Sequence, residues 1–149
     1  MSYSKLSSVK AGGSRSLVRE LLRQRRPGDD AIIDSVRHGL PPSALEDLLD
    51  AGLSEDEVAS VIGFSVRTLA RKRDRRARLD VAQSDRAVRL ARVLAEADLY
   101  IGARDRALLW LRAKNWALGG RTPLELLATE PGVELVRQAL ATIAYGGVA

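Results

Sequence analysis

Apolar residues recur every three or four positions along most of the chain, which is the spacing of one buried face of an α-helix. Glycine and proline divide this pattern into short segments. Pro27-Gly28 ends a basic helix expected over residues 16–26, and Gly39 ends a second short helix. Ser43 is expected to cap a third helix that Gly52 closes. No alternating pattern of useful length indicates a strand, so the sequence predicts an all-α protein.

The segment 54–73 has the form of a helix-turn-helix. Ser54 and Glu57 are spaced as a capping box, in which each side chain accepts a hydrogen bond from the other's backbone N–H group. Gly63 permits a tight turn, and Ser65 caps the next helix. The first helix is thus expected to support a second one across a short corner.

The apolar pattern of the C-terminal half predicts four more helices. Ser84 or Asp85 is expected to open a longer helix that Gly102 interrupts, and a further helix is expected over residues 104–114. The stretch Thr122-Pro123-Leu124-Glu125 is a second capping box, with proline at the first helical position. A last helix follows.

Several apolar residues of this half are expected to be buried. The last helix begins at Pro131 and is expected to turn Leu135 and Ile143 inward. Aromatic residues make up only 4% of the chain, and tryptophan is more often a core anchor than a cofactor contact. Trp110 and Trp116 are therefore expected to pack in the core.

Charge adds a second prediction. The chain of 149 residues carries a net charge of +5. Residues 65–78 alone hold seven basic side chains and one acid, a local charge of +6, so the remainder is nearly neutral. Such a basic segment favours nucleic acid as a partner.

The basic helix after Gly63 suggests how DNA is read. Its N-terminal side chains Arg67, Thr68 and Arg71 are expected near base edges, where arginine can bridge guanine O6 and N7. Phosphate contacts are expected from the surrounding residues Ser65, Lys72, Arg73, Arg75 and Arg76. The alternative is that this run is only a solvated basic helix stabilised by neighbouring acids.

The order of these segments resembles the MbcA/ParS/Xre antitoxins of bacterial toxin–antitoxin pairs. The resemblance covers roughly residues 35–147. It rests on Val36–Pro41, Leu53–Val58, Gly63–Lys72, Arg89–Leu94, Asn115–Leu127 and Pro131–Gly146, which occur in the family's order. The resemblance implies an Xre-type helix-turn-helix that binds the promoter of its own operon, a C-terminal helical toxin-binding domain, and a homodimer in a type II system.

The resemblance also implies a toxin as the partner and a C-terminal tip that contacts it. The usual partner is a RES-domain toxin that acts on NAD, and the antitoxin can occlude the toxin's NAD pocket with its C-terminal region. By that analogy the toxin-binding candidates are Tyr145, Gly146 and Gly147, with Arg121 a weaker one. A frayed terminus with Tyr145 packed on the core is an equal alternative.

Three segments are expected: a flexible basic part at 1–30, a DNA-binding domain at 31–80, and a toxin-binding and dimerisation domain at 81–149. His38 is the only histidine and there is no cysteine, so we expect neither a metal site nor a cofactor, and no catalytic set appears. The protein is expected in the cytoplasm. The rival function is a stand-alone transcription regulator whose C-terminal half only dimerises.

Overall fold

The computed structural model describes residues 16–146, and this part of the chain is helical apart from turns and one isolated bridge between Asn115 and Arg121. The elements in chain order are α2 (Leu17–Leu22), α3 (Asp29–His38), α4 (Ser43–Asp50), α5 (Glu55–Ile62), α6 (Val66–Asp74), α7 (Val81–Ile101), α8 (Arg104–Arg112), the 3₁₀ turn η1 (Trp116–Leu118), α9 (Pro123–Leu126) and α10 (Glu130–Ala144). The predicted all-α fold is confirmed.

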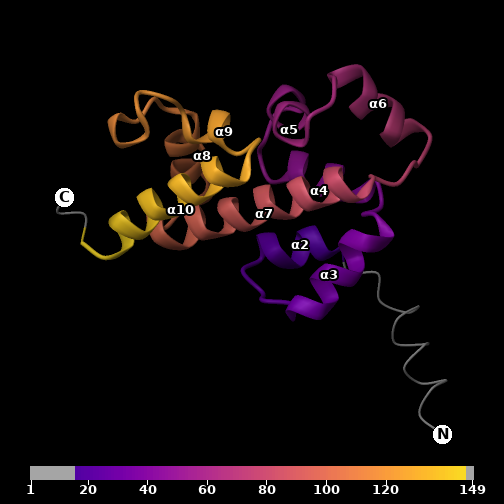
Figure 1. Ribbon diagram of the computed structural model, residues 1–149, viewed down its shortest axis with the longest axis horizontal. Helices are drawn as coiled ribbons and strands as arrows, with labels where there is room; N and C mark the ends of the chain where they lie inside the picture. Colours follow the sequence, from indigo (N-terminus) through magenta and orange to yellow (C-terminus); the bar gives the residue numbers. More distant parts are fainter. Residues whose placement is uncertain (1–15, 147–149) are drawn as a thin grey trace, which may run out of the picture.

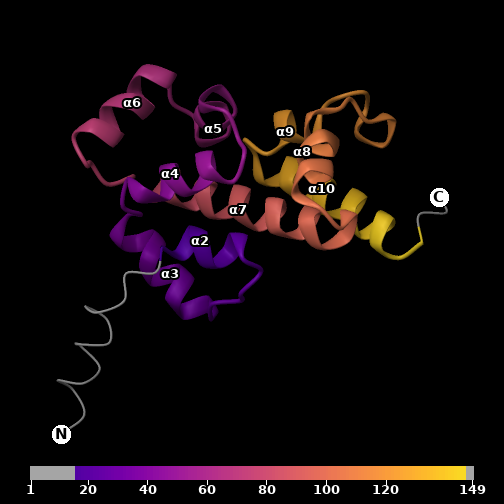
Figure 2. The same ribbon diagram turned by 180° about the vertical axis from the view of Figure 1, so that it is seen from behind.

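Helix α7 is the central element of the fold. It runs through the long dimension of the molecule, and α2, α3, α5, α8 and α10 all pack against it (Figure 1). Its core side chains Leu90, Val93 and Leu94 are fully buried. The views in Figures 1 and 2 place α6 at one end of the molecule and the end of α10 at the other.

The start of α7 differs from the sequence prediction. Asp80, not Ser84 or Asp85, caps the helix: its side chain accepts from the Gln83 backbone N–H at 2.7 Å, and the Gln83 side chain accepts from the Asp80 N–H at 3.0 Å. Ser84 is instead fully buried inside the helix, where its hydroxyl accepts from the Leu40 N–H at 2.8 Å. A capping box of the Asp–Gln kind therefore lies one turn before the expected start.

Helix α4 also begins differently. Pro42 is its N-cap residue, and Ser43, the expected cap, is the first helical residue with no capping hydrogen bond from its side chain. Helices α5, α6 and α9 begin at the predicted caps Ser54, Ser65 and Thr122.

Part of the N-terminal segment packs against the core. Residues 17–22 form α2, in which Val18 is fully buried and Leu21 is 6% exposed. Arg19 pairs with the buried carboxylate of Asp47 at 2.9 Å, which ties α2 to α4. Of the segment expected to be flexible over residues 1–30, residues 17–22 form a helix whose apolar face covers α7, and residues 1–15 lie outside the described range.

Two apolar residues of α10 face solvent, contrary to the prediction. Leu135 is 48% and Ile143 is 40% exposed. The helix packs on α7 through Val133, Val136 and Leu140 instead. A narrower buried stripe suffices here, because α10 lies at the edge of the molecule with only one face covered (Figure 1).

Candidate nucleic-acid interface and partner-binding surface

The turn between α5 and α6 is built around Gly63. Its φ of 93° is in the left-handed region, and its N–H donates to the Ala59 carbonyl at 2.8 Å. The Arg86 guanidinium of α7 donates to the Ile62 carbonyl at 2.9 Å and fills the space that a Cβ at Gly63 would need. The corner therefore requires glycine, and α7 fixes its position.

The first turn of α6 is rigid. The Ser65 hydroxyl oxygen accepts from the Thr68 N–H at 3.0 Å, and the hydroxyl donates to the Thr68 Oγ1 at 3.0 Å. Leu69 is fully buried and anchors the helix. Arg67 and Arg71, four residues apart, are exposed on one side, and neither has an ion-pair partner among residues 16–146. They are the cations of α6 best placed to contact a ligand.

Arg73, a predicted phosphate contact, is already engaged by carboxylates. Its guanidinium pairs with Glu46 of α4 and, at 3.1 Å, with Glu55 of α5. The hydrogen bond to Glu46 raises the pKa of Arg73 above its ordinary value, and Glu55 adds to the shift. Arg73 thus joins three helices and holds α6 in place.

Further basic residues lie beyond the end of α6. Arg75 is the C-cap residue and Arg76 has a φ of 49°, and both are exposed. The Lys72 ammonium donates to the Arg78 carbonyl at 3.2 Å, which leaves its charge unneutralised. We use "basic strip" for the exposed side chains Arg67, Arg71, Arg75 and Arg76.

The turn after α8 presents an exposed tryptophan. Trp116 is 95% exposed, so the expectation that it anchors the core was wrong. The Asn115 side chain accepts from the Ala117 N–H at 2.9 Å, and Gly119 and Gly120 both have positive φ values, so the turn is tightly closed on itself. The turn holds Trp116 outward, whereas Trp110 packs partly buried against the core.

The sequence-predicted partner residues lie at the same end of the molecule. Arg121 is exposed and follows the Trp116 turn, where its carbonyl accepts from the Asn115 N–H at 3.0 Å. Tyr145, at the end of α10, is 86% exposed, and Gly146 has a φ of 103°. Gly147 lies outside the described residues. Tyr145 therefore does not pack on the core as the alternative interpretation expected.

The exposed apolar residues of this half were missed by sequence reasoning. Leu109 is 68% and Leu99 is 52% exposed, although both lie in helices with a clear apolar stripe. The sequence could have indicated their exposure, because each is an apolar residue outside the periodically spaced positions that form the buried face of its helix.

An ion pair joins the helix-turn-helix half of the chain to the C-terminal half. Arg112 of α8 binds both carboxylate oxygens of Glu57 in α5, at 2.8 Å each, and also donates to the Gly52 carbonyl at 2.8 Å. The hydrogen bond from Arg112 lowers the pKa of Glu57, despite the opposing effect of burial. The same bond raises the pKa of Arg112.

Two further surveys concern the part of the chain that the structure describes. Among residues 16–146, no group of three or more His, Asp or Glu side chains is arranged to hold a metal ion. No helix in that range is both long and apolar enough to cross a membrane.

Comparison with protein families assigns both halves. Residues 31–92 match the antitoxin Xre-like helix-turn-helix domain, and residues 96–146 match the antitoxin Xre/MbcA/ParS C-terminal toxin-binding domain. Helix α7 extends across both matched ranges, so the boundary expected between residues 80 and 81 stays a prediction.

Individual relatives agree with these matches. An antitoxin Xre of Yersinia enterocolitica is 29% identical over 135 residues, which cover 89% of this chain and 90% of that protein. An antitoxin Xre of Pseudomonas putida is 35% identical over 81 residues, 54% of this chain and 51% of that protein.

A solved structure shares the fold. A chain in the crystal structure of the M. tuberculosis MbcT–MbcA toxin–antitoxin complex is 25% identical to this chain, with a TM-score of 0.55. The match covers 72% of this chain and 96% of that one. With a helix-turn-helix domain followed by a toxin-binding domain in one all-α chain, the protein belongs to the Xre/MbcA/ParS family of antitoxins.

Proposed function

We propose that this antitoxin neutralises a RES-domain toxin that acts on NAD, by occluding the toxin's active site, and that it represses its own operon by binding DNA. The observation that carries the proposal is the separation of two unlike surfaces at opposite ends of α7 (Figure 1). The basic strip lies at one end, and exposed apolar side chains of the toxin-binding domain lie at the other.

The DNA surface is centred on the start of α6. Arg67, Thr68 and Arg71 read base edges, and Ser65, Lys72, Arg75 and Arg76 contact phosphates. Arg73 supports binding to the DNA backbone mainly by holding α6 in place, since two carboxylates neutralise its charge. A homodimer presents two such helices to a two-fold symmetric operator in the cytoplasm.

Binding to the promoter fragment upstream of the gene tests this surface. Arg67→Ala weakens operator binding and blurs base preference, whereas Lys72→Ala lowers the slope of log K against log salt by about 1. Arg106→Ala is the matched control, because Arg106 is an exposed arginine on α8, outside the helix-turn-helix. Isotherms that are the same for all three variants reject the DNA surface.

The toxin surface combines the exposed Trp116 and Leu109 with the Tyr145 tip. The family match names residues 96–146 as toxin-binding, and large apolar side chains left in water are typical of protein interfaces. Tyr145, Gly146 and Gly147 enter the mouth of the toxin's NAD pocket, and Arg121 contacts its rim. Small residues at 146 and 147 allow close backbone approach.

Neutralisation of growth arrest tests the tip. Removing residues 145–149 abolishes rescue by the antitoxin while leaving co-purification with the toxin measurable through Trp116. Removing only residues 148–149 is the control and keeps full rescue. Full rescue by the longer truncation rejects the tip model.

The rival function is a stand-alone regulator whose C-terminal half only dimerises. The two functions differ in what co-purifies with the chain. Co-expression with the product of the adjacent reading frame yields a stable complex if the protein is paired with a toxin. A regulator without a toxin yields the antitoxin-like chain alone.

A further inference from the structure

A cavity of about 540 Å³ lies beside α7. One wall comes from α2, α3 and their connection, which lie on the side of α7 away from α5 and α6 (Figures 1 and 2). The other walls come from the middle of α7 and from Arg137 of α10. The volume is in the range of small-molecule sites. Residues 23–28 of the connection precede the first residue matched by either family domain.

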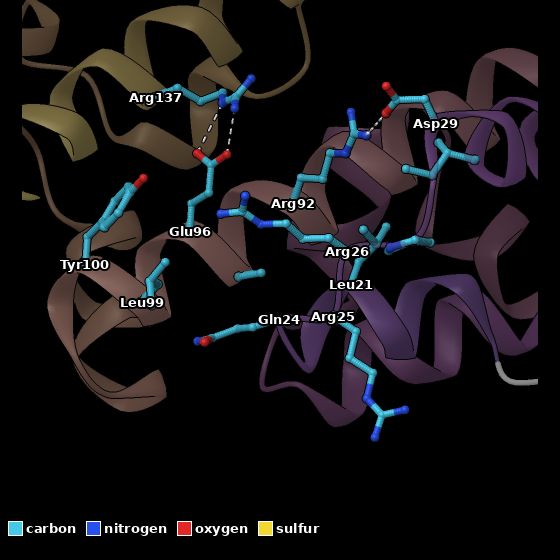
Figure 3. A pocket seen from close by; sticks show the side chains of 13 residues that line it. Leu21, Gln24, Arg25, Arg26, Asp29, Arg92, Glu96, Leu99, Tyr100 and Arg137 are labelled. Carbon is cyan, nitrogen blue, oxygen red and sulfur yellow. Dashed lines mark hydrogen bonds and ion pairs between the residues drawn. The ribbon is translucent and has the colours of Figure 1, made fainter.

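The α2–α3 connection is held in one shape. Gln24 adopts a φ of 60°, and the Arg25 N–H donates to the Glu20 carbonyl at 3.1 Å. The Arg104 guanidinium donates to the Leu22 carbonyl at 3.2 Å and fixes the end of α2. Figure 3 shows the consequence: the Arg26 side chain extends across the cavity towards Glu96 and Leu99.

The cavity is positively charged. Four arginines and two carboxylates line it. Glu96 is occupied by a two-point contact with Arg137, at 2.7 and 3.1 Å, which leaves little of its charge for other groups. Arg92 reaches the 93%-exposed Asp29 only at 3.9 Å, a weak and solvent-screened pairing. Arg26 has no ion-pair partner among residues 16–146.

The cavity also has an apolar side. Leu21 and Ile32 form part of its lining, and Leu99 contributes a side chain that is 52% exposed. Tyr100 lies next to Leu99 at the same end of the cavity, near Arg137 (Figure 3). A flat ring can pack against Leu99 and Tyr100 while anionic groups reach Arg26 and Arg92.

We propose that this cavity binds a nucleoside phosphate, with its phosphates held by Arg26 and Arg92 and its base against Leu99 and Tyr100. Guanidinium groups suit this ligand because their fixed donors match phosphate oxygens in pairs. The bound ligand links the α2–α3 connection to α7. The site is separate from the basic strip and from the Trp116 surface, and it depends on neither proposed function.

Isothermal titration of the full-length protein with ADP, adenosine and inorganic phosphate at fixed ionic strength tests the proposal. ADP binds saturably with one site per chain, and adenosine and phosphate each bind at least tenfold more weakly. Arg26→Gln weakens ADP binding about tenfold, through loss of a charge-assisted contact. The control Arg23→Gln removes an equal charge from the same segment outside the cavity and leaves ADP binding unchanged.

A second readout is thermal stability, which ADP raises in the wild type and in Arg23→Gln but not in Arg26→Gln. Equal melting temperatures without ligand establish that the variants fold alike. The proposal is overturned by no saturable ADP binding, by equal losses in both variants, or by phosphate binding as tightly as ADP, which indicates an anion patch only. Displacement of ADP by duplex DNA also overturns it.

Discussion

Replacing Trp116 with alanine is expected to disrupt the toxin complex without affecting the fold. The indole is 95% exposed, so the free protein gains almost nothing from it. The surrounding turn is held by Asn115 and by backbone hydrogen bonds that the substitution leaves in place. The side chain is therefore available to a partner at no cost in rearrangement, which is a feature of interface hot spots.

The size of the effect follows from the exposed area. A tryptophan buries roughly 150–250 Å² when it is fully covered. At about 25 cal/mol per Å², covering it contributes at most about 6 kcal/mol, and the measurable share is smaller because binding has its own entropic cost. We expect a loss of about 2–4 kcal/mol, equivalent to a weakening of the toxin complex of roughly 30- to 1000-fold.

The assay is titration of purified toxin with each antitoxin variant, together with urea unfolding of the free antitoxin. Val81→Ala is the matched control, since Val81 is an apolar residue 54% exposed at the other end of α7. It is expected to change toxin affinity less than twofold. A loss below threefold for Trp116→Ala, or a loss equal to that of the control, refutes the reasoning.

Four other substitutions test the stability of the fold and its DNA binding. Arg73→Gln lowers the free energy of unfolding by about 1 kcal/mol, because it breaks two partly exposed ion pairs, and it leaves the salt slope of DNA binding unchanged. Arg71→Gln has the opposite pattern: it lowers the salt slope by about 1 and leaves urea unfolding unchanged. Glu57 has a lowered pKa in the folded protein, so its contribution to stability is complete above its ordinary pKa of 4.5 and is lost as the pH falls through the folded pKa. The wild type is therefore expected to lose more stability over this acid range than Glu57→Gln does. Urea unfolding curves that change in parallel with pH for the two proteins contradict this. Gly132→Ala places a Cβ against the Leu126 carbonyl and lowers stability by about 2 kcal/mol, and an unchanged urea midpoint argues against that contact.

The helices that the sequence predicted best are those defined by local chemistry. Ser54, Ser65 and Thr122 cap helices as expected, because a capping hydrogen bond joins residues only two or three positions apart. The predicted start of α7 at Ser84 or Asp85 was wrong, because Asp80 and Gln83 form an equally local capping box one turn earlier. The local sequence pattern was therefore sufficient to locate the start of this helix.

Contacts between distant segments were beyond the sequence. The seven basic residues of 65–78 could be counted, but Arg73 finds its partners in α4 and α5, 27 and 18 positions away. The exposure of Trp116 depends on where the turn after α8 points once α8 has packed on α7. Composition favours burying tryptophan, and only the three-dimensional arrangement overrides that preference.

The two proposed surfaces are connected by one continuous helix. Helix α7 is unbroken for 21 residues, and Arg86 and Arg112 attach the helix-turn-helix to α7 and α8 at separate points. The positive-φ residues Gly63, Arg76 and Gly102 lie in the connections that flank α6 and at the end of α7, and none lies within α7 itself. Toxin bound at the Trp116 end is therefore not expected to bend the helix that connects it to the helix-turn-helix. We expect any effect of toxin on DNA binding to arise from the spacing of the basic strips in the assembled complex, and hence to depend on how many antitoxin chains it contains.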